Sequence, residues 1–298
     1  MFLLQSVFQS RPLTCREIAL PAMSSKIAKR LSKVHQLEVP IWKEPDYICD
    51  ALQRWLCQLM NTPTGQNSFL LPSRYSQWAP AQLTCKDIAR ELDHLRTMIS
   101  KSKSPVTFCH NDLQEGNILL PKASSGNIRL PSLCDEAPGG LSLAAFNPAD
   151  PRLVLIDFEY ASYNYRGFDF ANHFVEYSID YDILDHPHYK INPENFPEEE
   201  QLVEFFVNYL REFGGTPECQ LYKKAEELVK VRNPSICSCL PFLLGSLGSA
   251  AGGIVTSWIW IRGKTFRQDY LEYGRDRIGL YFQHRHLLDL FNVDQNVQ

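Results

Sequence analysis

The sequence predicts an α+β fold that is mainly helical, with a small β element carrying a short polar loop. Apolar residues recur at helical spacing through most of the first hundred residues and again after residue 160. Between these regions lie two short apolar runs bounded by turn residues, a pattern typical of strands. With 298 residues and 44% hydrophobic content, the chain can bury one large core or two smaller ones.

Three helices are predicted in the first hundred residues. Ser24 and Ser25 are expected to cap the first, because serine side chains can accept hydrogen bonds from the free N–H groups of a first turn. The second and third are expected over 46–60 and 84–100, where apolar residues share one face. The stretch 61–68 between them has the composition of a loop.

The β element is expected in the middle of the chain. Residues 106–120 read as a short strand, a loop and a second strand, and 153–160 form an apolar β-run that includes an acid. The intervening 121–152 are rich in Pro, Ser and Gly and predict a long flexible insertion. Helices are expected again over 196–215 and 266–290.

Composition restricts the class of partner. The 30 basic and 34 acidic residues give a net charge of −4, which argues against nucleic acid or an anionic membrane surface and favours a small-molecule ligand. Nine cysteines are scattered without zinc-type spacing, and reduced cysteines imply a cytoplasmic protein.

Residues 233–261 carry no charge and are long enough to cross a bilayer. Pro241 and several glycines interrupt this stretch, and a buried interior helix gives the same signal. A buried element is therefore favoured over membrane attachment, and no stable membrane insertion is expected.

The segment FCHNDLQEGNILL (108–120) carries the clearest chemical signal. His110, Asp112 and Asn117 match the spacing H-x-D-x-x-x-x-N, and Asp157 follows in the second β-run. Phosphoryl transfer needs a group to accept the substrate hydroxyl proton and oxygen ligands to hold Mg²⁺ against the nucleotide phosphates. Each residue alone could be an ordinary turn residue, but the ordered combination indicates a phosphoryl-transfer loop.

The HNDLQEGNILL loop and the run IDFEYASYNYRGFDFANHFVEY (156–177) resemble the choline/ethanolamine kinase family, and most of all its choline kinases. The resemblance extends from residues 11–14 to 273–282. It implies a protein-kinase-like fold, represented mainly by the helical C-terminal lobe. It also implies ATP-dependent phosphorylation of choline, with ethanolamine as the other candidate, in the first step of phospholipid head-group synthesis, with Mg²⁺ and ATP required.

The resemblance assigns roles to residues of the loop and of the second β-run. Asp112 would be the catalytic base, and Asn117 and Asp157 would hold Mg²⁺, with Glu159 on the same strand face as Asp157 in support. Asp157 and Gln114 would contact the nucleotide cofactor or its metal, although Gln114 could equally face solvent.

A second set of residues would bind the substrate or support the loop. A quaternary ammonium has no N–H group, so aromatic faces and carboxylates must recognise it. The substrate candidates are Tyr160, Glu176, Tyr181, Tyr270 and Tyr273. Ordinary core packing is the alternative for each tyrosine. The residues expected to support the catalytic loop are His110, Arg166 and Asp169, with a surface ion pair as the alternative for the last two.

Two features depart from the family pattern. Trp258 and Trp260 are two residues apart where the family has a Trp-x-x-Trp helix that closes the substrate cage. Residues 1–109 contain one glycine, Gly65, so no glycine-rich nucleotide loop is expected there. The expectation is a single C-terminal lobe over 1–298, in which 1–20 lead in from the hinge and the N-terminal nucleotide lobe is absent. The chain could then be inactive alone. The alternative function is a non-catalytic kinase relic that binds a small cation or a homologous partner; a homodimer or heterodimer stays open.

Overall fold

The structure is a computed structural model. It describes residues 10–101, 104–121, 129–132, 142–145, 153–231, 259–261, 264–266 and 270–286.

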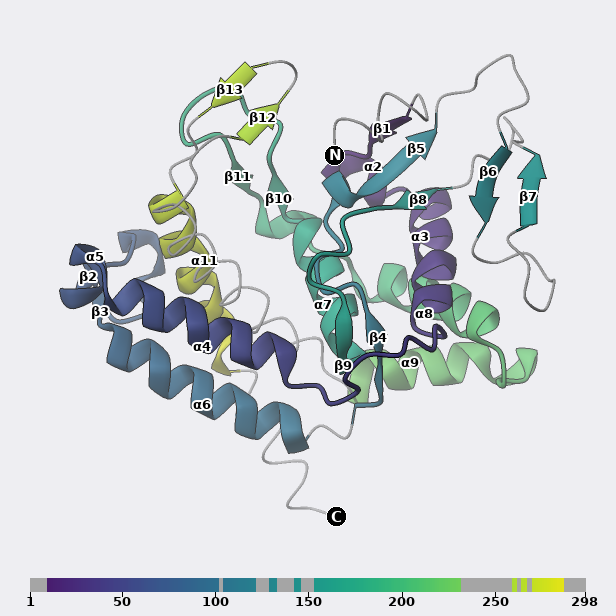
Figure 1. Cartoon of the computed structure of the whole chain (residues 1–298), viewed down its shortest axis with the longest axis horizontal. Coiled ribbons are helices and arrows are strands. Elements are labelled where there is room, and N and C mark those ends of the chain that lie inside the picture. Colours follow the sequence, from purple (N-terminus) through teal and green to yellow (C-terminus); the bar gives the residue numbers. More distant parts are fainter. Residues whose placement is uncertain are drawn as a thin grey trace.

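One group of helices lies on the left of Figure 1. It contains α4 (Tyr47–Met60) and α6 (Cys85–Lys101), which confirm the predicted second and third helices, and α11 (Tyr270–His284). The predicted loop between α4 and α6 instead begins with α5 (Pro63–Gln66), because proline suits a first helical turn and the Thr62 hydroxyl accepts the Gly65 N–H. The short strands β2 (Phe69–Leu70) and β3 (Gln82–Leu83) then pair around the 3₁₀ turn η1 (Ser73–Tyr75).

A second group of helices lies on the right of Figure 1 and contains α3 (Pro21–Val34), α8 (Glu199–Phe213) and α9 (Leu221–Val231). The prediction that Ser24 and Ser25 cap a helix was wrong. The helix begins earlier, at Pro21, whose fixed φ is compatible with a first helical position. The helix predicted within 196–215 is confirmed by α8, which ends at Gly214 with a φ of 81°.

Two small antiparallel sheets are formed by the first described strand of the chain and by strands from its middle. In the first, β5 (Ile118–Pro121) pairs on one side with β1 (Ser10–Pro12), which leads into the short helix α2 (Cys15–Ile18), and on the other with β8 (Val154–Leu155). In the second, β4 (Val106–Cys109) pairs with β9 (Ser162–Tyr165). The loop 110–117 connects β4 to β5 and so joins the two sheets, which confirms the predicted strand–loop–strand unit.

Two hairpins include residues from segments for which the sequence predicted no strands, 121–152 and 233–261. The insertion 121–152 contains a paired hairpin, β6 (Arg129–Ser132) and β7 (Ser142–Ala145), so it is not without secondary structure. At the end of the stretch 233–261, predicted to be a buried element, Ile259–Ile261 is the strand β12, paired with β13 (Lys264–Phe266). Residues 232–258 lie outside the described ranges, so that prediction is not tested. Among the described residues, no helix has the length and apolar character needed to span a membrane.

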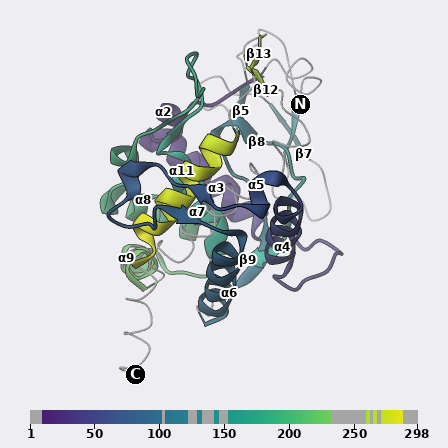
Figure 2. The same cartoon turned by 90° about the vertical axis from the view of Figure 1, so that its left-hand side faces the viewer.

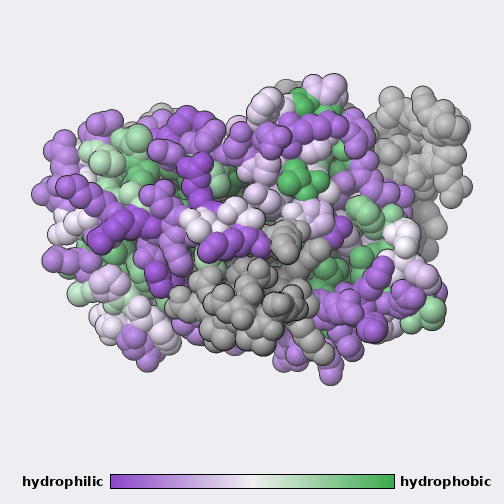
Figure 3. Space-filling view, turned by 90° about the horizontal axis from the view of Figure 1, so that it is seen from below, coloured by the Kyte–Doolittle hydropathy of each residue, from purple (hydrophilic) through white to green (hydrophobic). Residues whose placement is uncertain are grey.

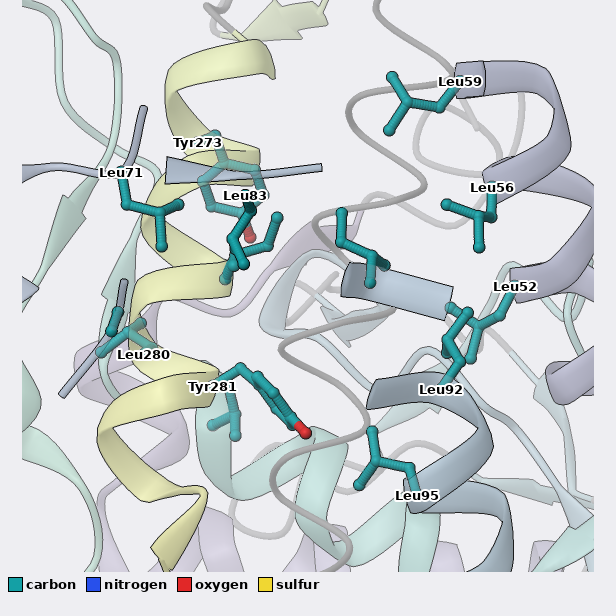
Figure 4. Close-up of a cluster of buried hydrophobic side chains, with 14 of the residues drawn as sticks. Leu52, Leu56, Leu59, Leu71, Leu83, Leu92, Leu95, Tyr273, Leu280 and Tyr281 are labelled. Carbon is teal, nitrogen blue, oxygen red and sulfur yellow. The ribbon is translucent and has the colours of Figure 1, made fainter. Parts of the chain in front are cut away.

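The buried helix α7 (Gly167–Glu176) separates two hydrophobic cores. Phe168 and Val175 of α7 pack into the core formed with α4, α6 and α11, part of which is drawn in Figure 4. Phe170 and Phe174 pack into the core formed with α3 and α8. Seen from the side in Figure 2, α7 lies within the helices rather than at the surface. The third face of α7 is thereby left for polar residues, and it carries the candidate site.

Short connections complete the fold. They are the strands β10 (Ile179–Asp180) and β11 (Lys190–Ile191), which pair with each other, and the 3₁₀ turns η2 (Glu115–Asn117), η3 (Pro193–Asn195) and η4 (Glu218–Gln220). The face drawn in Figure 3 is largely hydrophilic outside the grey residues, with hydrophobic residues in small separate areas.

Gly279 of α11 packs closely against the ring of Tyr75. A Cβ at this position would lie 2.2 Å from Cδ2 of Tyr75, a ring that is 5% exposed. We expect Gly279→Ala to lower the free energy of unfolding by about 1–3 kcal/mol, because the ring must move in a packed core. Urea titration measures this. In a Tyr75→Ala background the same substitution should cost nothing, and an equal loss in both backgrounds would contradict the steric explanation.

Candidate active site

The polar face of α7 carries four residues at helical spacing. Asp169, Asn172, His173 and Glu176 follow the pattern i, i+3, i+4, i+7, so their side chains lie along one stripe. All four are buried. The first three bind the backbone of the loop 110–117, and the fourth lies in the tyrosine cluster described below.

Asp169 holds the start of the loop. Its Oδ2 accepts the backbone N–H of His110 and its Oδ1 that of Asn111, both at 2.7 Å. His35, from the end of α3, adds a contact of 3.1 Å from Nε2 to the same carboxylate, and its Nδ1 lies 2.9 Å from the Tyr209 hydroxyl. Burial is the largest single influence and acts to raise the pKa of Asp169, but the hydrogen bonds from His35 and the His110 N–H, together with the electrostatic effects of these two histidines, outweigh it and the pKa is lowered. Asp169 is therefore an ionised anchor.

The rest of the loop is held equally closely. Asn172 Oδ1 accepts the N–H of Leu113 at 2.7 Å, and His173 Nδ1 lies 3.1 Å from the Leu113 carbonyl. Asn111, with a φ of 64°, donates through Nδ2 to the Tyr160 carbonyl and to the Ser162 hydroxyl, each at 2.9 Å. Asparagine tolerates this left-handed conformation better than most residues. The loop is thus fixed on both sides.

His110 is fully buried, and its Nε2 lies 2.9 Å from the carbonyl of Ile156. This contact ties the loop to the chain just before Asp157. Burial lowers the pKa of His110, which therefore stays neutral near pH 7. The contact is the one expected of a residue that supports the loop.

Asp112 projects from this fixed loop. Asn117 donates through Nδ2 to the Asp112 carbonyl at 2.9 Å and to its Oδ2 at 3.0 Å, and Gln114 Nε2 lies 3.3 Å from the same Oδ2. Burial raises the pKa of Asp112 to about 7, and the charges of Glu176 and Asp157 add to the rise. The loop thus presents a carboxylate that can accept a proton near neutral pH.

Asp157 and Glu159 come from the other side of the site. The Ile156 N–H donates to the Asn117 carbonyl at 3.0 Å, which brings Asp157 next to the loop 110–117. The predicted β-run is shorter than expected: β8 ends at Leu155, and Asp157 lies beyond the strand with a φ of 64°. Asp157 and Glu159 therefore do not share a strand face, although both are exposed.

The set of donors suits a hard divalent cation. Mg²⁺ prefers carboxylate and amide oxygens. Asn117 uses Nδ2 for both bonds to Asp112, so its amide oxygen is the atom left to bind a metal ion. The charge of Asp157 acts on Asp112 across the same space.

A tyrosine cluster lies beside Glu176. The Tyr181 hydroxyl donates to Glu176 Oε2 at 2.9 Å and lies 2.6 Å from the Tyr273 hydroxyl. Arg277 Nη1 donates to Tyr273 at 2.6 Å and lies 3.4 Å from Glu176 Oε1, while the Tyr189 ring lies 4.9 Å from that of Tyr273. Burial raises the pKa of Tyr273 to about 12, so its hydroxyl stays protonated. Glu176, Tyr181 and Tyr273 thus come together as the sequence predicted.

The other predicted residues are placed as follows. Tyr160 is partly buried, and its ring packs edge-on against Trp55 with centroids 6.1 Å apart. Arg166 is buried, with its guanidinium over the rings of Tyr209 and Phe213, so the alternative of a surface ion pair with Asp169 was wrong. Tyr270 begins α11, but its side chain is outside the described residues. The same holds for Trp258 and the side chain of Trp260.

Sequence reasoning missed several residues that hold the site: His35, Asn172, His173 and Arg277. The stripe on α7 could have been found from spacing, since Asp169, Asn172 and Glu176 recur at helical intervals among apolar residues. No local signal points to His35, which lies 134 positions before Asp169.

The sequence profile described as choline/ethanolamine kinase matches residues 3–282. The chain belongs to the choline/ethanolamine kinase family. It is 59% identical to choline kinase A2 of Caenorhabditis elegans over 286 residues, which cover 96% of this chain and 64% of that protein. It is 34% identical to a human choline/ethanolamine kinase, covering 95% of this chain and 61% of that one. The chain therefore spans less than two thirds of the length of these relatives.

Solved structures of the choline/ethanolamine kinase family confirm the fold. A choline kinase from Cryptosporidium parvum superposes with a TM-score of 0.65 at 21% identity, covering 97% of this chain and 70% of that one. An ethanolamine kinase from Plasmodium vivax superposes with a TM-score of 0.60 at 18% identity. The match covers 91% of this chain and 62% of that one. The predicted kinase-like α+β fold is thereby confirmed.

Proposed function

We propose that the protein phosphorylates choline or ethanolamine with ATP, in the first step of phospholipid head-group synthesis. The observation that carries the proposal is the position of Asp112. Its carboxylate, with a pKa raised to about 7, is acted on by the charges of Glu176, in the tyrosine cluster, and of Asp157. A base at this point would serve an alcohol bound by the tyrosine cluster and attacking a phosphate held near Asp157.

In the proposed mechanism, Asp112 accepts the proton of the substrate hydroxyl as the hydroxyl oxygen attacks the γ-phosphorus of ATP. The bond from the γ-phosphorus to the bridging oxygen breaks, and ADP leaves. Asn117 orients the Asp112 carboxylate by its bond of 3.0 Å to Oδ2, and its amide oxygen would join Asp157 in holding Mg²⁺. The metal ion, when bound, neutralises charge on the phosphates. Glu159 and Gln114 lie close enough in the chain to support this arrangement. The Asp169 network keeps the base in place, so little reorganisation is needed in the reaction.

The tyrosine cluster would bind the ammonium head group. Aromatic faces and carboxylates attract a cation that has no N–H to donate. Glu176, Tyr181 and Tyr273 are joined by hydrogen bonds, and Tyr160 lies near the base, whose charge acts on it. Both substrates named by the relatives fit this chemistry, because each joins a cation to a primary alcohol. Cytoplasmic location and dimerisation stay predictions.

Metal removal tests the proposal. The chain is incubated with ATP, Mg²⁺ and choline or ethanolamine, and the phosphomonoester is followed by ³¹P NMR. We expect product formation that a chelator abolishes and added Mg²⁺ restores, because Asn117 and Asp157 cannot neutralise the phosphates themselves. Absence of product under all conditions would contradict the proposed function.

A second candidate is a non-catalytic member that binds the same cations, since the tyrosine cluster does not depend on the catalytic step. Calorimetry distinguishes the two. Choline binding without any phosphomonoester would favour the binding protein, whereas binding with turnover favours the kinase.

A further inference from the structure

Arg277 is a buried arginine in the tyrosine cluster to which the mechanism above gives no role. It lies one turn after Tyr273 on α11, so the two side chains share one face of the helix. Its Nη1 donates to the Tyr273 hydroxyl at 2.6 Å and lies 3.4 Å from Glu176 Oε1. Buried charged groups in proteins are ordinarily paired, and these contacts supply the pairing. Arg277 therefore connects α11 to the last residue of α7.

The chemistry of the side chains sets the direction of three successive hydrogen bonds in the cluster. A guanidinium only donates, an ionised carboxylate only accepts, and each tyrosine hydroxyl has one proton. Tyr181 donates its proton to Glu176 Oε2 at 2.9 Å, so it must accept in its 2.6 Å bond with Tyr273. The Tyr273 oxygen in turn accepts from Arg277. The bonds therefore run in one direction, from the guanidinium through two hydroxyls to the carboxylate. We call these four residues the hydrogen-bond chain.

This direction suits a cationic head group. Both hydroxyl protons are used within the hydrogen-bond chain, so neither Tyr181 nor Tyr273 directs an O–H group at a ligand. The trimethylammonium group of choline has no N–H and is attracted by aromatic faces and by a carboxylate. An O–H group that pointed at it would repel it, because the hydroxyl proton carries a partial positive charge.

The direction depends on the charges at the two ends of the hydrogen-bond chain. A carboxylate buried as Glu176 is buried would be disfavoured as an anion without the guanidinium beside it. A protonated carboxyl group can donate, and the bonds can then run the other way and leave the Tyr273 proton for a ligand. The guanidinium also repels a bound cation directly. These two effects of Arg277 have opposite signs, so an experiment can separate them.

We propose that Arg277 is a positioning residue that makes the head-group pocket selective for a cationic alcohol over an uncharged alcohol of the same shape. The inference rests on the proposed function and adds a residue to its substrate site. Arg277 acts through Tyr273 and Glu176: it holds both in place, keeps the carboxylate charged and sets the direction of the hydroxyl groups. It takes no part in proton transfer.

The experiment compares choline with 3,3-dimethylbutan-1-ol, an uncharged alcohol of the same shape. Calorimetry measures the binding of each to the wild-type chain and to Arg277→Met, which keeps an unbranched side chain and removes the charge and the donors. We expect choline to bind about tenfold more weakly to the variant and the uncharged alcohol to bind within about twofold of wild type. In turnover assays KM for choline should rise by a similar factor, while kcat stays within about threefold.

Two further variants keep the proposal testable even if Arg277→Met folds poorly. Arg277→Lys keeps the charge and a donor, and it should keep the preference for choline over the uncharged alcohol. Tyr273→Phe keeps the ring and removes the hydroxyl through which Arg277 acts, so it should reduce that preference. In the double variant Arg277→Met, Tyr273→Phe the losses of choline affinity should not multiply, because both substitutions break the same hydrogen-bond chain.

Arg285→Met is the matched control. Arg285 also pairs with a glutamate of another helix, Glu91 of α6, at 2.7 Å, but it is not one of the four residues of the hydrogen-bond chain. Its replacement removes the same charge and should lower the stability of α11. It should change the affinity for neither alcohol, which separates a loss of selectivity from a general loss of packing.

Four results would overturn the inference. They are choline affinity that is unchanged or stronger in Arg277→Met, equal weakening of choline and the uncharged alcohol, loss of the preference in Arg277→Lys, and an unchanged preference in Tyr273→Phe. A wild-type chain that binds neither choline nor ethanolamine would remove the proposed function and this inference with it. Wild-type binding that is insensitive to Arg277→Met would remove the inference alone.

Discussion

Asp112→Asn should abolish phosphoryl transfer while making the chain more stable at alkaline pH. An amide cannot accept the hydroxyl proton, and general-base catalysis typically contributes about 10²–10⁴-fold to the rate. The new side chain keeps an oxygen that can accept the bonds from Asn117 and Gln114, so the loop should keep its geometry. The loss should appear in kcat more than in choline affinity, which calorimetry measures separately.

The gain in stability follows from the raised pKa of Asp112. Between its ordinary value of 3.8 and about 7, the folded chain binds a proton that the unfolded chain has released, so stability falls as pH rises through this range. Above pH 7 the charged side chain should cost up to about 4 kcal/mol, since each pKa unit corresponds to ~1.4 kcal/mol. Asp112→Asn should recover on the order of 1–4 kcal/mol at pH 8.

Urea titrations at pH 5 and pH 8 measure this difference. The advantage of Asp112→Asn should be small at pH 5 and large at pH 8. The matched control is Asp93→Asn, which changes an exposed aspartate on α6 and should give no such difference. A variant that is destabilised at both pH values would contradict the assignment of Asp112 as a strained, functional carboxylate.

Asp169→Ala should produce the largest loss of stability among single changes near the site. The substitution removes the acceptor of two backbone N–H groups at 2.7 Å and of the His35 Nε2 contact at 3.1 Å, all of them buried. Each unsatisfied buried donor costs about 1–3 kcal/mol, so a total of about 3–5 kcal/mol is expected. Thermal or urea unfolding measures the loss, and kcat should fall with it because the loop carrying Asp112 is released.

Asp169→Asn separates the charge from the hydrogen bonds. It keeps one acceptor oxygen and should cost less than Asp169→Ala. The pKa of Asp169 is lowered, so its contribution is present above the unfolded pKa and is lost as pH falls through the folded value. The difference in stability between wild type and Asp169→Ala should therefore shrink in acid. A difference that stayed constant down to strongly acidic pH would contradict an ionised anchor.

The two aspartates show why spacing predicted one part of the site and missed another. Asp112 and Asn117 lie on one loop, and their bond of 3.0 Å joins residues five positions apart, so a local pattern contains the information. Asp169 binds a loop 58 and 59 positions earlier and a histidine 134 positions earlier. Such partners are chosen by the packing of α3 and α7, which no local motif encodes.

Hydrophobic periodicity was enough to predict α4, α6 and α8, because each buries one apolar face. For α11 it gave the wrong start, since Phe266 lies in β13 and the helix begins at Tyr270. It gave the wrong boundary for α3, where the fixed φ of Pro21 starts the helix before the serines. It also overextended β8, because an apolar run does not show where the chain must turn to place Asp157.

The sequence by itself determined the order of the elements and the residues that can do chemistry: a base, metal-binding oxygens and a set of tyrosines with one glutamate. Only the tertiary structure decided that Arg277 pairs with Glu176, and that burial among acidic groups raises the pKa of Asp112 to about 7. The physical reason is that pKa values and ion pairs depend on distance and solvent exclusion, and both arise when α7 is packed between the two cores.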